Sequence, residues 1–207
     1  AGVQPQSETV WQQAKRYNVP CIAFINKMDR VGADFSKAVS SIDEQLSANP
    51  VAIQMPIGSE DQFEGVVDLV AMQEFRFKDE SWGLEFERAE LTEALRPQAE
   101  EERREMLEKL SLYDDDLLEK IVEEQKIGQS EIIKVLRAAT LDGQITPVLC
   151  GSAFKNKGVQ QVIDAVVNYL PSPLDIPPVE GDHPVTKKLV KRDASAFDHM
   201  CALAFKV

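Results

Sequence analysis

Residues 21–29 read CIAFINKMD, and this stretch decides the fold. The apolar run at 21–25 has the composition of a buried strand, and the polar loop NKMD at 26–29 follows it directly. A second unit of the same kind joins the apolar run at 147–150 to the polar loop GSAFK at 151–155. Open α/β sheets bind their ligands at the carboxyl ends of their strands. The two loops therefore predict an α/β fold with a ligand site at one edge of a parallel sheet.

The side chains of the first loop favour a guanine base as the ligand. The Asp29 carboxylate can accept hydrogen bonds from both N–H donors on the Watson–Crick edge of guanine, a pair that adenine lacks. Asn26 can donate to the N7 atom of the base, and Lys27 can lie over its ring. The tetrapeptide alone is a weak signal, because Asn and Asp are also common in ordinary turns. Its place after a buried strand and the second loop favour the nucleotide interpretation.

The sequence around both loops is similar to one protein family. The pairing of the NKMD loop with Ser152 and Ala153 resembles the fourth and fifth guanine-nucleotide motifs of GTPases. Longer stretches closely resemble the elongation factor G family of bacterial translational GTPases, and the likeness runs from end to end. These stretches are GVQPQSETVW at 2–11, INKMDR at 25–30, GSAFKNKG at 151–158 and YLPSP at 169–173. The resemblance implies that Asn26, Lys27, Asp29, Ser152 and Ala153 bind the guanine nucleotide.

The resemblance also implies a division of the chain. Residues 1–58 and 147–170 would form the rear half of a P-loop GTPase-type GTP-binding domain, interrupted by an inserted acidic α+β subdomain at 59–146. Residues 171–198 would be a linker, and 199–207 the first strand of a truncated β-barrel. The whole protein would hydrolyse GTP to GDP with Mg²⁺ during ribosomal translocation in the cytoplasm. Its partners would be the ribosome and, through the acidic insert, the ribosomal stalk protein.

One nucleotide motif is absent from the 207 residues. No Gly-x-x-x-x-Gly-Lys-Ser/Thr occurs, so the chain has neither a backbone cradle for the phosphates nor a hydroxyl ligand for Mg²⁺. Residues 29–32 match Asp-x-x-Gly, but Asp29 already belongs to the base loop, and we interpret that match as coincidence. We predict no catalytic residue and no metal ligand, and expect an inactive fragment of a GTPase. The exposed sheet edges of such a fragment favour a non-native dimer.

Charge is distributed unevenly along the chain. The formal net charge is -12, and residues 59–146 carry 24 acidic and 11 basic side chains, a net charge of -13. Such asymmetry is typical of a separate module with its own partner. The alternative to the GTPase interpretation is therefore a non-catalytic interaction module whose acidic insert docks a basic protein partner. An acidic surface kept only for solubility would give the same charge pattern.

Composition points to a globular protein without a membrane segment. Hydrophobic residues make up 43% of the chain, but no apolar run is long enough to span a bilayer. The three cysteines, Cys21, Cys150 and Cys201, lie in apolar runs, which favours reduced core thiols in a cytosolic protein. The two histidines, His183 and His199, flank a polar stretch and give no basis for a metal site.

Hydrophobic periodicity and turn residues predict the remaining elements. Pro5 favours the first turn of a helix that ends before Pro20, and Asp34 is the expected N-cap of a helix to Leu46. Lys155 and Lys157 have the pattern of solvated surface lysines and are left outside the predicted site. We expect strands at 51–57, 65–70, 74–77 and 84–87, helices at 89–110, 114–122, 130–142 and 158–170, and an extended proline-rich linker from 171.

Overall fold

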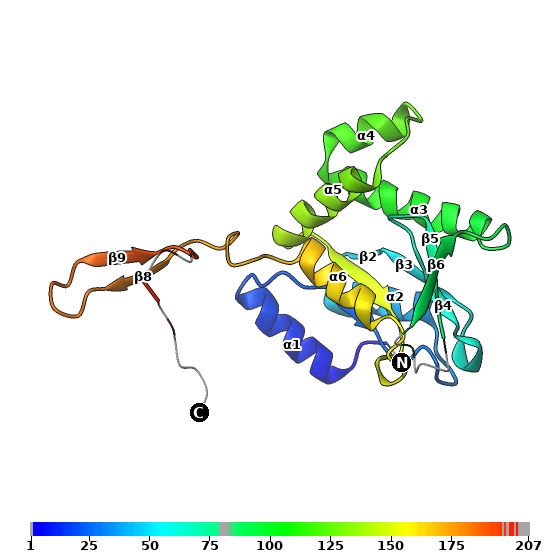
Figure 1. Ribbon diagram of the computed structural model, residues 1–207, viewed down its shortest axis with the longest axis horizontal. Helices are drawn as coiled ribbons and strands as arrows, with labels where there is room; N and C mark the ends of the chain where they lie inside the picture. The colour runs from blue at the N-terminus through cyan, green and yellow to red at the C-terminus, as the bar shows by residue number, and fades with distance from the viewer. Residues whose placement is uncertain are drawn as a thin grey trace. The chain divides into compact units, whose positions relative to one another are not determined.

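The computed structural model describes residues 2–78, 83, 85–195, 197, 199, 200 and 202 (Figure 1). The chain divides into two compact units, Ala1–Leu170 and Pro171–Val207.

A three-stranded parallel sheet lies at the centre of the first unit. Its strands are β1 (Ala23–Ile25), β7 (Thr146–Cys150) and β2 (Pro50–Ala52), in the order β1-β7-β2. Both pairings are parallel, and β7 is buried at all five positions, as expected of a central strand. Ile25 pairs with Cys150, so the loops that follow β1 and β7 leave the same edge of the sheet. The α/β prediction with a parallel sheet is confirmed.

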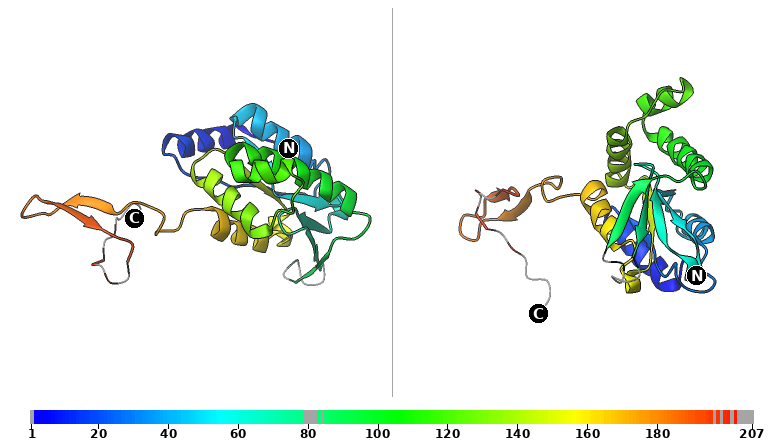
Figure 2. Two further views of the ribbon diagram at one scale, coloured as in Figure 1. Left: turned by 90° about the horizontal axis from the view of Figure 1, so that it is seen from above. Right: turned by 45° about the vertical axis from the view of Figure 1, so that its right-hand side comes forward.

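Helices cover both faces of this sheet. Figure 2 shows α1 (Pro5–Arg16) and α2 (Phe35–Leu46) on one face and α6 (Val159–Tyr169) on the other. Asp34 caps α2 as predicted, since its carboxylate accepts the Lys37 backbone N–H at 2.9 Å. The Trp11 indole N–H donates to the Leu46 carbonyl at 2.9 Å and joins α1 to the end of α2.

The chain passes from the parallel sheet into an antiparallel sheet at Ile53. The sequence predicts one strand over 51–57, whereas the structure has β2 and a separate β3 (Gln54–Ile57). Ile53 forms hydrogen bonds toward both sheets. Its N–H donates to the carbonyl of Val148, in β7 of the parallel sheet, at 3.1 Å, and its carbonyl accepts the N–H of Leu69, next to β4 of the antiparallel sheet, at 3.0 Å. The run at 51–57 is apolar except for Gln54, but the hydrogen-bonding partner of the chain changes at Ile53.

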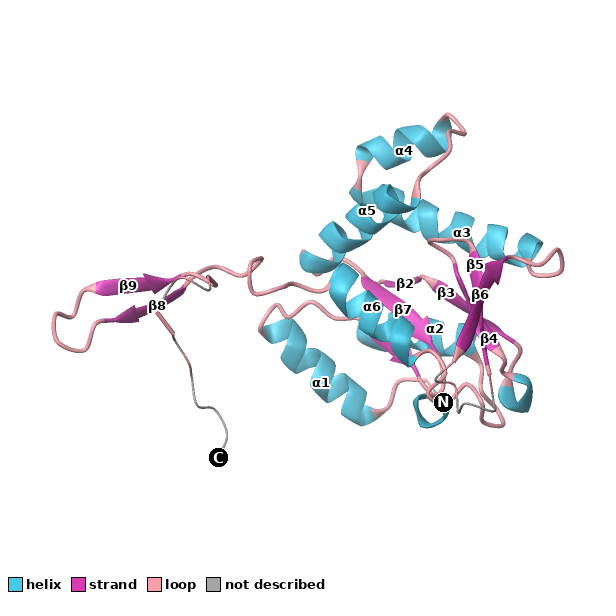
Figure 3. Ribbon diagram, in the orientation of Figure 1, coloured by secondary structure: helices cyan, strands magenta, loops and turns pink. Residues whose placement is uncertain are grey.

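The antiparallel sheet has the order β3-β4-β5-β6. It continues through β4 (Gly65–Asp68), β5 (Gln73–Phe77) and β6 (Phe86–Glu90), with a 3-10 turn η1 (Glu60–Gln62) between β3 and β4. These strands confirm the predicted β-rich start of the insert. Figure 3 shows the strands beside the helices that follow them.

Three helices complete the first unit: α3 (Arg96–Leu110), α4 (Asp115–Val122) and α5 (Gln129–Leu141). Another 3-10 turn, η3 (Ser111–Tyr113), joins α3 to α4. The prediction of a helix from residue 89 is wrong, because 86–90 pair with β5 and the helix begins only at Arg96. Pro97 lies in the first turn of α3, the place where a proline fits a helix. Asp114 caps α4 by accepting the Leu117 N–H at 2.8 Å.

One hydrophobic core is shared by the parallel sheet and the predicted insert. Residues of β2, β7 and α6 belong to the same cluster as residues of α3 and α5. Its members include Val51, Leu149, Ala165, Tyr169, Met106, Leu110, Ile132 and Leu136. Burying one such aliphatic or aromatic side chain stabilises a protein by about 1.5–3 kcal/mol. Helices α3 and α5 of the predicted insert therefore pack against the parallel sheet and α6 through this shared core.

The second unit contains a β-hairpin. Its strands, β8 (Val179–Asp182) and β9 (Leu189–Arg192), pair antiparallel, whereas the sequence predicts an extended linker over 171–198. Apolar and polar residues alternate only weakly in these strands, and most of their residues are exposed. The sequence therefore gives little sign of them. The predicted strand at 199–207 lies, apart from His199, Met200 and Ala202, outside the described residues.

Cys150 is buried and Cys21 half-buried, and both are free thiols, while Cys201 lies outside the described residues. Burial raises the pKa of both thiols above the ordinary value. Among the described residues, no helix is both long and apolar enough to cross a membrane.

Candidate functional site

The two predicted loops lie side by side at the carboxyl edge of the parallel sheet. The Met28 N–H donates to the Gly151 carbonyl at 3.0 Å, and the Gly151 N–H donates to the Ile25 carbonyl at 3.0 Å. These bonds continue the β1–β7 pairing beyond the ends of the strands. The structure thus brings together two segments that are more than a hundred residues apart in the chain.

Asn26 joins the two loops through its side chain. Its Oδ1 atom accepts the backbone N–H of Ala153 at 2.9 Å and that of Lys27 at 2.7 Å. The two bonds fix the orientation of the amide, and its Nδ2 group is the side-chain donor that can bind a ligand. Asn26, Lys27 and Ala153 are all exposed. Lys27 has a φ of +65°, a left-handed conformation that turns the loop sharply at this residue.

Asp29 is partly buried at the carboxyl end of the parallel sheet, and its surroundings stabilise the charged form of its side chain. Its side chain is 14% exposed, and the Nζ atom of Lys155 is 3.6 Å from its Oδ2 atom. Burial raises the pKa of Asp29, but the Ser152 hydroxyl, its own backbone N–H and the charge of Lys155 outweigh burial. The pKa of Asp29 therefore lies below its ordinary value.

Ser152 carries a buried hydroxyl next to Asp29. The residue is 1% exposed, and its Oγ has no hydrogen-bond partner within ordinary geometry among the described residues. The hydroxyl stabilises the Asp29 carboxylate by proximity, although it falls outside the geometric limits of a hydrogen bond. A buried polar atom without a partner is uncommon, and one beside a binding edge is consistent with a partner that arrives as a ligand.

The second loop is closed by its own backbone. The Ser152 N–H donates to the Lys157 carbonyl at 2.9 Å, and the Lys157 N–H donates back to the Ser152 carbonyl at 3.0 Å. The turn η4 (Ala153–Lys155) lies between them. Gly158 follows with a φ of +86°, and a Cβ there would lie 2.7 Å from the Cys150 carbonyl oxygen. Only glycine fits this position without displacing β7.

Lys157 is not a surface lysine, which corrects the expectation from the sequence. It is 3% exposed, and its Nζ donates to the Phe63 carbonyl at 3.0 Å. Lys155, which the sequence also predicts to be a surface lysine, is partly exposed and lies beside Asp29. The local sequence gives no sign of this difference, because the acceptor of Lys157 lies 94 residues away.

A cavity of about 890 Å³ lies beside the loops but is not the predicted site. It follows the edge of β1 between α1 and α2, and Val3, Val10, Trp11, Cys21 and Phe24 are among its lining residues. It reaches Asn26 and Lys27, whereas Asp29, Ser152 and Ala153 do not line it. The convergence of polar groups, and not this cavity, therefore defines the candidate site.

The chain is similar to known proteins over most or all of its length. The family model described as the elongation factor Tu GTP binding domain matches residues 1–172. Elongation factor G of Thermotoga petrophila is 51% identical over all 207 residues, and elongation factor G 2 of Syntrophus aciditrophicus is 49% identical over the same span. The chain covers 30% and 31% of these two proteins, so it spans about a third of the length of its relatives. The resemblance to elongation factor G found in the sequence is confirmed.

The fold also has a counterpart among solved structures. A crystal structure of a Thermus thermophilus protein superposes with a TM-score of 0.72 at 24% identity, covering 92% of this chain and 29% of that one. This match supports the α/β architecture alone. The family model covers most of the chain, and on that ground the chain belongs to the family of the elongation factor Tu GTP binding domain.

Proposed function

We propose that this chain is the guanine-recognition part of an elongation factor G, a GTPase that drives translocation on the ribosome during protein synthesis in the cytoplasm. Identity of about 50% over the whole chain to proteins of that name supports the assignment. The observation that carries it is the junction of the two loops, in which Asn26 accepts the Ala153 N–H at 2.9 Å. This family match favours the GTPase over the alternative of a non-catalytic interaction module.

Five residues are proposed to hold the base of GTP or GDP. Asp29 accepts the N1 and N2 hydrogens of guanine, Asn26 donates from Nδ2 to N7, and Lys27 covers one face of the ring. Ser152 and Ala153 form the opposite wall, where the Ser152 hydroxyl supports the charge of Asp29. The Asn26 amide, fixed through its Oδ1 atom, fits such a ligand.

The five proposed base-binding residues do not bind the phosphates of the nucleotide. The chain contains no Gly-x-x-x-x-Gly-Lys-Ser/Thr, so Mg²⁺ and the β- and γ-phosphates find no ligands of that kind here. We propose that the whole protein supplies them and hydrolyses GTP, while the 207-residue chain binds the base without hydrolysis. Base recognition by this chain then sets which nucleotide the whole protein accepts.

We also propose a division of labour along the chain. Residues 1–58 and 147–170 carry the nucleotide site, 59–146 form the acidic insert, 171–198 connect to the next domain, and 199–207 begin its β-barrel. The insert is proposed to contact the ribosomal stalk protein. Its helix α3 supports this role, because Glu101 and Glu108 expose more than half of their side chains on a segment of net charge -13. Complementary charge of this kind steers association.

A titration of the ¹⁵N-labelled chain tests the base site. GDP is expected to shift the amide signals of residues 26–29 and of Ser152 and Ala153, whereas ADP at the same concentration leaves them unchanged. The matched phosphates of the two ligands make the base the only difference. Equal shifts with GDP and ADP would overturn the proposed function.

A further inference from the structure

The turn at residues 58–64, between β3 and β4, contacts the first base loop through Glu60. The Glu60 backbone N–H donates to the Met28 carbonyl at 3.0 Å, and its Oε1 atom accepts the Gly32 N–H at 2.7 Å. Glu60 therefore holds the loop at two points that flank Asp29 in the sequence. Glu60 adopts a φ of +56°, a conformation that non-glycine residues take up only when their contacts hold them there.

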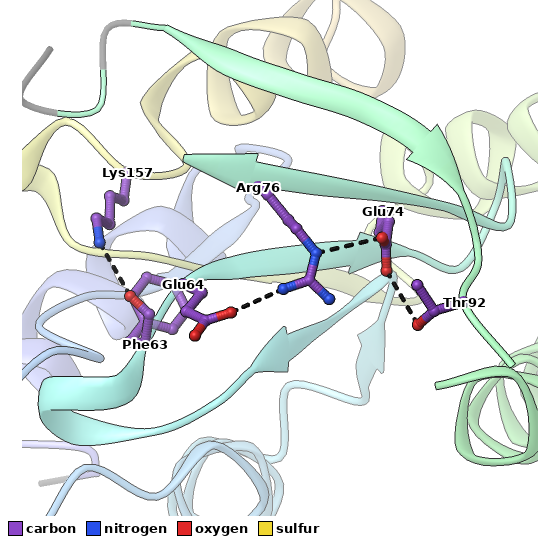
Figure 4. A network of polar contacts seen from close by, with 6 residues as sticks. All are labelled: Phe63, Glu64, Glu74, Arg76, Thr92 and Lys157. Atoms are coloured by element: carbon purple, nitrogen blue, oxygen red, sulfur yellow. Dashed lines mark hydrogen bonds and ion pairs between the residues drawn. The ribbon is translucent and has the colours of Figure 1, made fainter. Parts of the chain in front are cut away.

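The same turn contacts the second base loop through Phe63. Its carbonyl accepts the hydrogen bond from Lys157 Nζ at 3.0 Å, which Figure 4 shows. Lys157 is also the residue whose backbone closes the second loop onto Ser152. Phe63 is itself buried in the cluster that contains Met28 of the first loop. One turn thus connects to both halves of the predicted base site.

The antiparallel sheet holds this turn in place. Glu64 pairs with Arg76 of β5 at 2.7 Å, and Arg76 also pairs with the buried carboxylate of Glu74 at 3.2 Å (Figure 4). The Thr92 hydroxyl lies 3.5 Å from Glu74 and extends the network beyond β6. The position of the turn therefore depends on residues of the insert and not on the turn alone.

The connection between β5 and β6 contacts the second base loop at Gly83. A Cβ placed on Gly83, which has a φ of +72°, would lie 2.2 Å from the Lys155 carbonyl oxygen. No side chain fits there without moving one of the two backbones. The second base loop is thus bordered by the insert at Gly83 as well as at Phe63.

We propose that Glu60 and Lys157 are positioning residues for guanine recognition. Neither touches the base, but together they fix Asp29 on one loop relative to Ser152 and Ala153 on the other. A bidentate hydrogen bond to the base tolerates displacements of only about 0.5 Å. Guanine specificity therefore depends on a turn of the insert that lies far from either loop in the sequence. This inference rests on the proposed base site.

The test compares GDP with IDP, which lacks only the 2-amino group of the base, on the full-length protein. Removing one hydrogen bond to a carboxylate is expected to weaken wild-type binding by roughly tenfold or more. Lys157→Met and Glu60→Ala are each expected to reduce this GDP preference by about threefold or more, because Asp29 is no longer held in register. A residue that served stability alone would lower the melting temperature and leave the ratio unchanged.

Two matched variants serve as controls. Glu60→Gln keeps an acceptor for the Gly32 N–H and is expected to keep the GDP preference of the wild type. Lys134→Met removes an exposed lysine of α5 and is also expected to keep it. Should Lys157→Met not fold, the Glu60→Ala and Glu60→Gln pair carries the test alone. Glu60→Ala with an unchanged ratio overturns the inference, whereas a wild type that does not distinguish GDP from IDP overturns the base site itself.

Discussion

The ammonium group of Lys155 lies 3.6 Å from the Asp29 carboxylate, in a chain where the sequence assigns Lys155 to the solvated surface. Burial raises the pKa of Asp29, but the Ser152 hydroxyl, the backbone N–H and the Lys155 charge lower it further than burial raises it. A carboxyl group with a lowered pKa contributes stability above its unfolded pKa. That contribution disappears as the pH falls through the lowered folded pKa.

Lys155→Met is therefore expected to raise the pKa of Asp29. It should also lower the free energy of unfolding at pH 7, with a difference from wild type that disappears as the pH falls below both pKa values. An NMR titration of the Asp29 carboxyl carbon and urea unfolding at several pH values measure the two effects. An unchanged Asp29 pKa in this variant would show that the ion pair contributes nothing.

Asp29→Asn should change the base preference of the full-length protein. The substitution replaces one acceptor by a donor, so the amide can pair with the 2-oxo group of xanthine but no longer with the 2-amino group of guanine. Sites built on such hydrogen bonds reject a mismatched partner by roughly a hundredfold or more. Competition between GDP and xanthosine diphosphate measures the change. Retained preference for GDP would remove Asp29 from its proposed role.

The 207-residue chain by itself should bind GDP weakly. It holds the base loops, but no Gly-x-x-x-x-Gly-Lys-Ser/Thr occurs in its sequence. A few polar contacts to a small ligand scarcely exceed the entropy lost on association, so we expect a dissociation constant of about a millimolar or weaker. Calorimetry with GDP and with guanosine checks this expectation. Similar affinities for the two ligands support it, and micromolar binding of GDP contradicts it.

The acidic face of α3 should control association with the stalk protein. Arg104 neutralises part of this face, since it lies 2.5 Å from Glu101 and 3.5 Å from Glu108. Exposed charges are screened over about 8 Å at physiological ionic strength, so salt should weaken binding mainly through the association rate. The test replaces four carboxylates by amides and measures association rates at two salt concentrations. The four are Glu101, Glu102, Glu105 and Glu108.

A matched variant separates local from total charge. It neutralises four exposed acidic residues outside the insert and should leave the association rate nearly unchanged. These are Glu8, Asp43, Glu44 and Asp164. Equal effects of the two variants would mean that the stalk protein senses only the net charge of the chain. No effect of either would leave the acidic face with a solubilising role.

Arg103 should be the most sensitive charged residue of the insert. Its guanidinium donates to the carbonyls of Leu69, Val70 and Ile127, and so joins α3 to the β4–β5 turn and to the start of α5. Arg103→Met leaves these acceptors without their donor. We expect a loss of about 2–4 kcal/mol in the free energy of unfolding at pH 7, measured with urea. Arg104→Met, which removes an exposed neighbour, should change it little.

The loss should also depend on pH through Asp68. Burial raises the pKa of Asp68, while the N–H groups of Ala71 and Val70 and the charges of Arg88 and Arg103 oppose that rise. A carboxyl group with a raised folded pKa lowers stability as the pH increases through that pKa. Without Arg103 the pKa rises further, so the deficit of Arg103→Met should be larger at pH 7 than at pH 3. A pH-independent deficit would mean that Asp68 is not involved.

Local patterns account for the parts of the fold that the sequence predicts. Asp34 is an N-cap by its position before an apolar stripe, and the strand at 23–25 follows from an unbroken apolar run. The two loops are recognisable because each motif directly follows such a strand. These features depend on neighbours within a few residues, which the sequence displays.

Features that depend on partners far away in the chain leave no local signal in the sequence. Nothing local marks Ile53 as the point where the chain changes sheets, because its partners are Val148 and Leu69. Lys157 is buried, and its Nζ donates to a carbonyl 94 residues away in the chain. The sequence misplaces the start of α3 because residues 86–90 gain their partner strand only in the folded chain.

The passage of the chain through both sheets at Ile53 bears on how the insert can evolve. An appendage joined at a surface loop could be gained, lost or exchanged by one recombination event that leaves its host intact. Here β2 pairs in the parallel sheet and β3 in the antiparallel sheet, and one core cluster lies beneath the parallel sheet and the helices of the proposed insert. An exchanged insert would have to bring its own copy of residues 50–57, so lineages should inherit the two parts together.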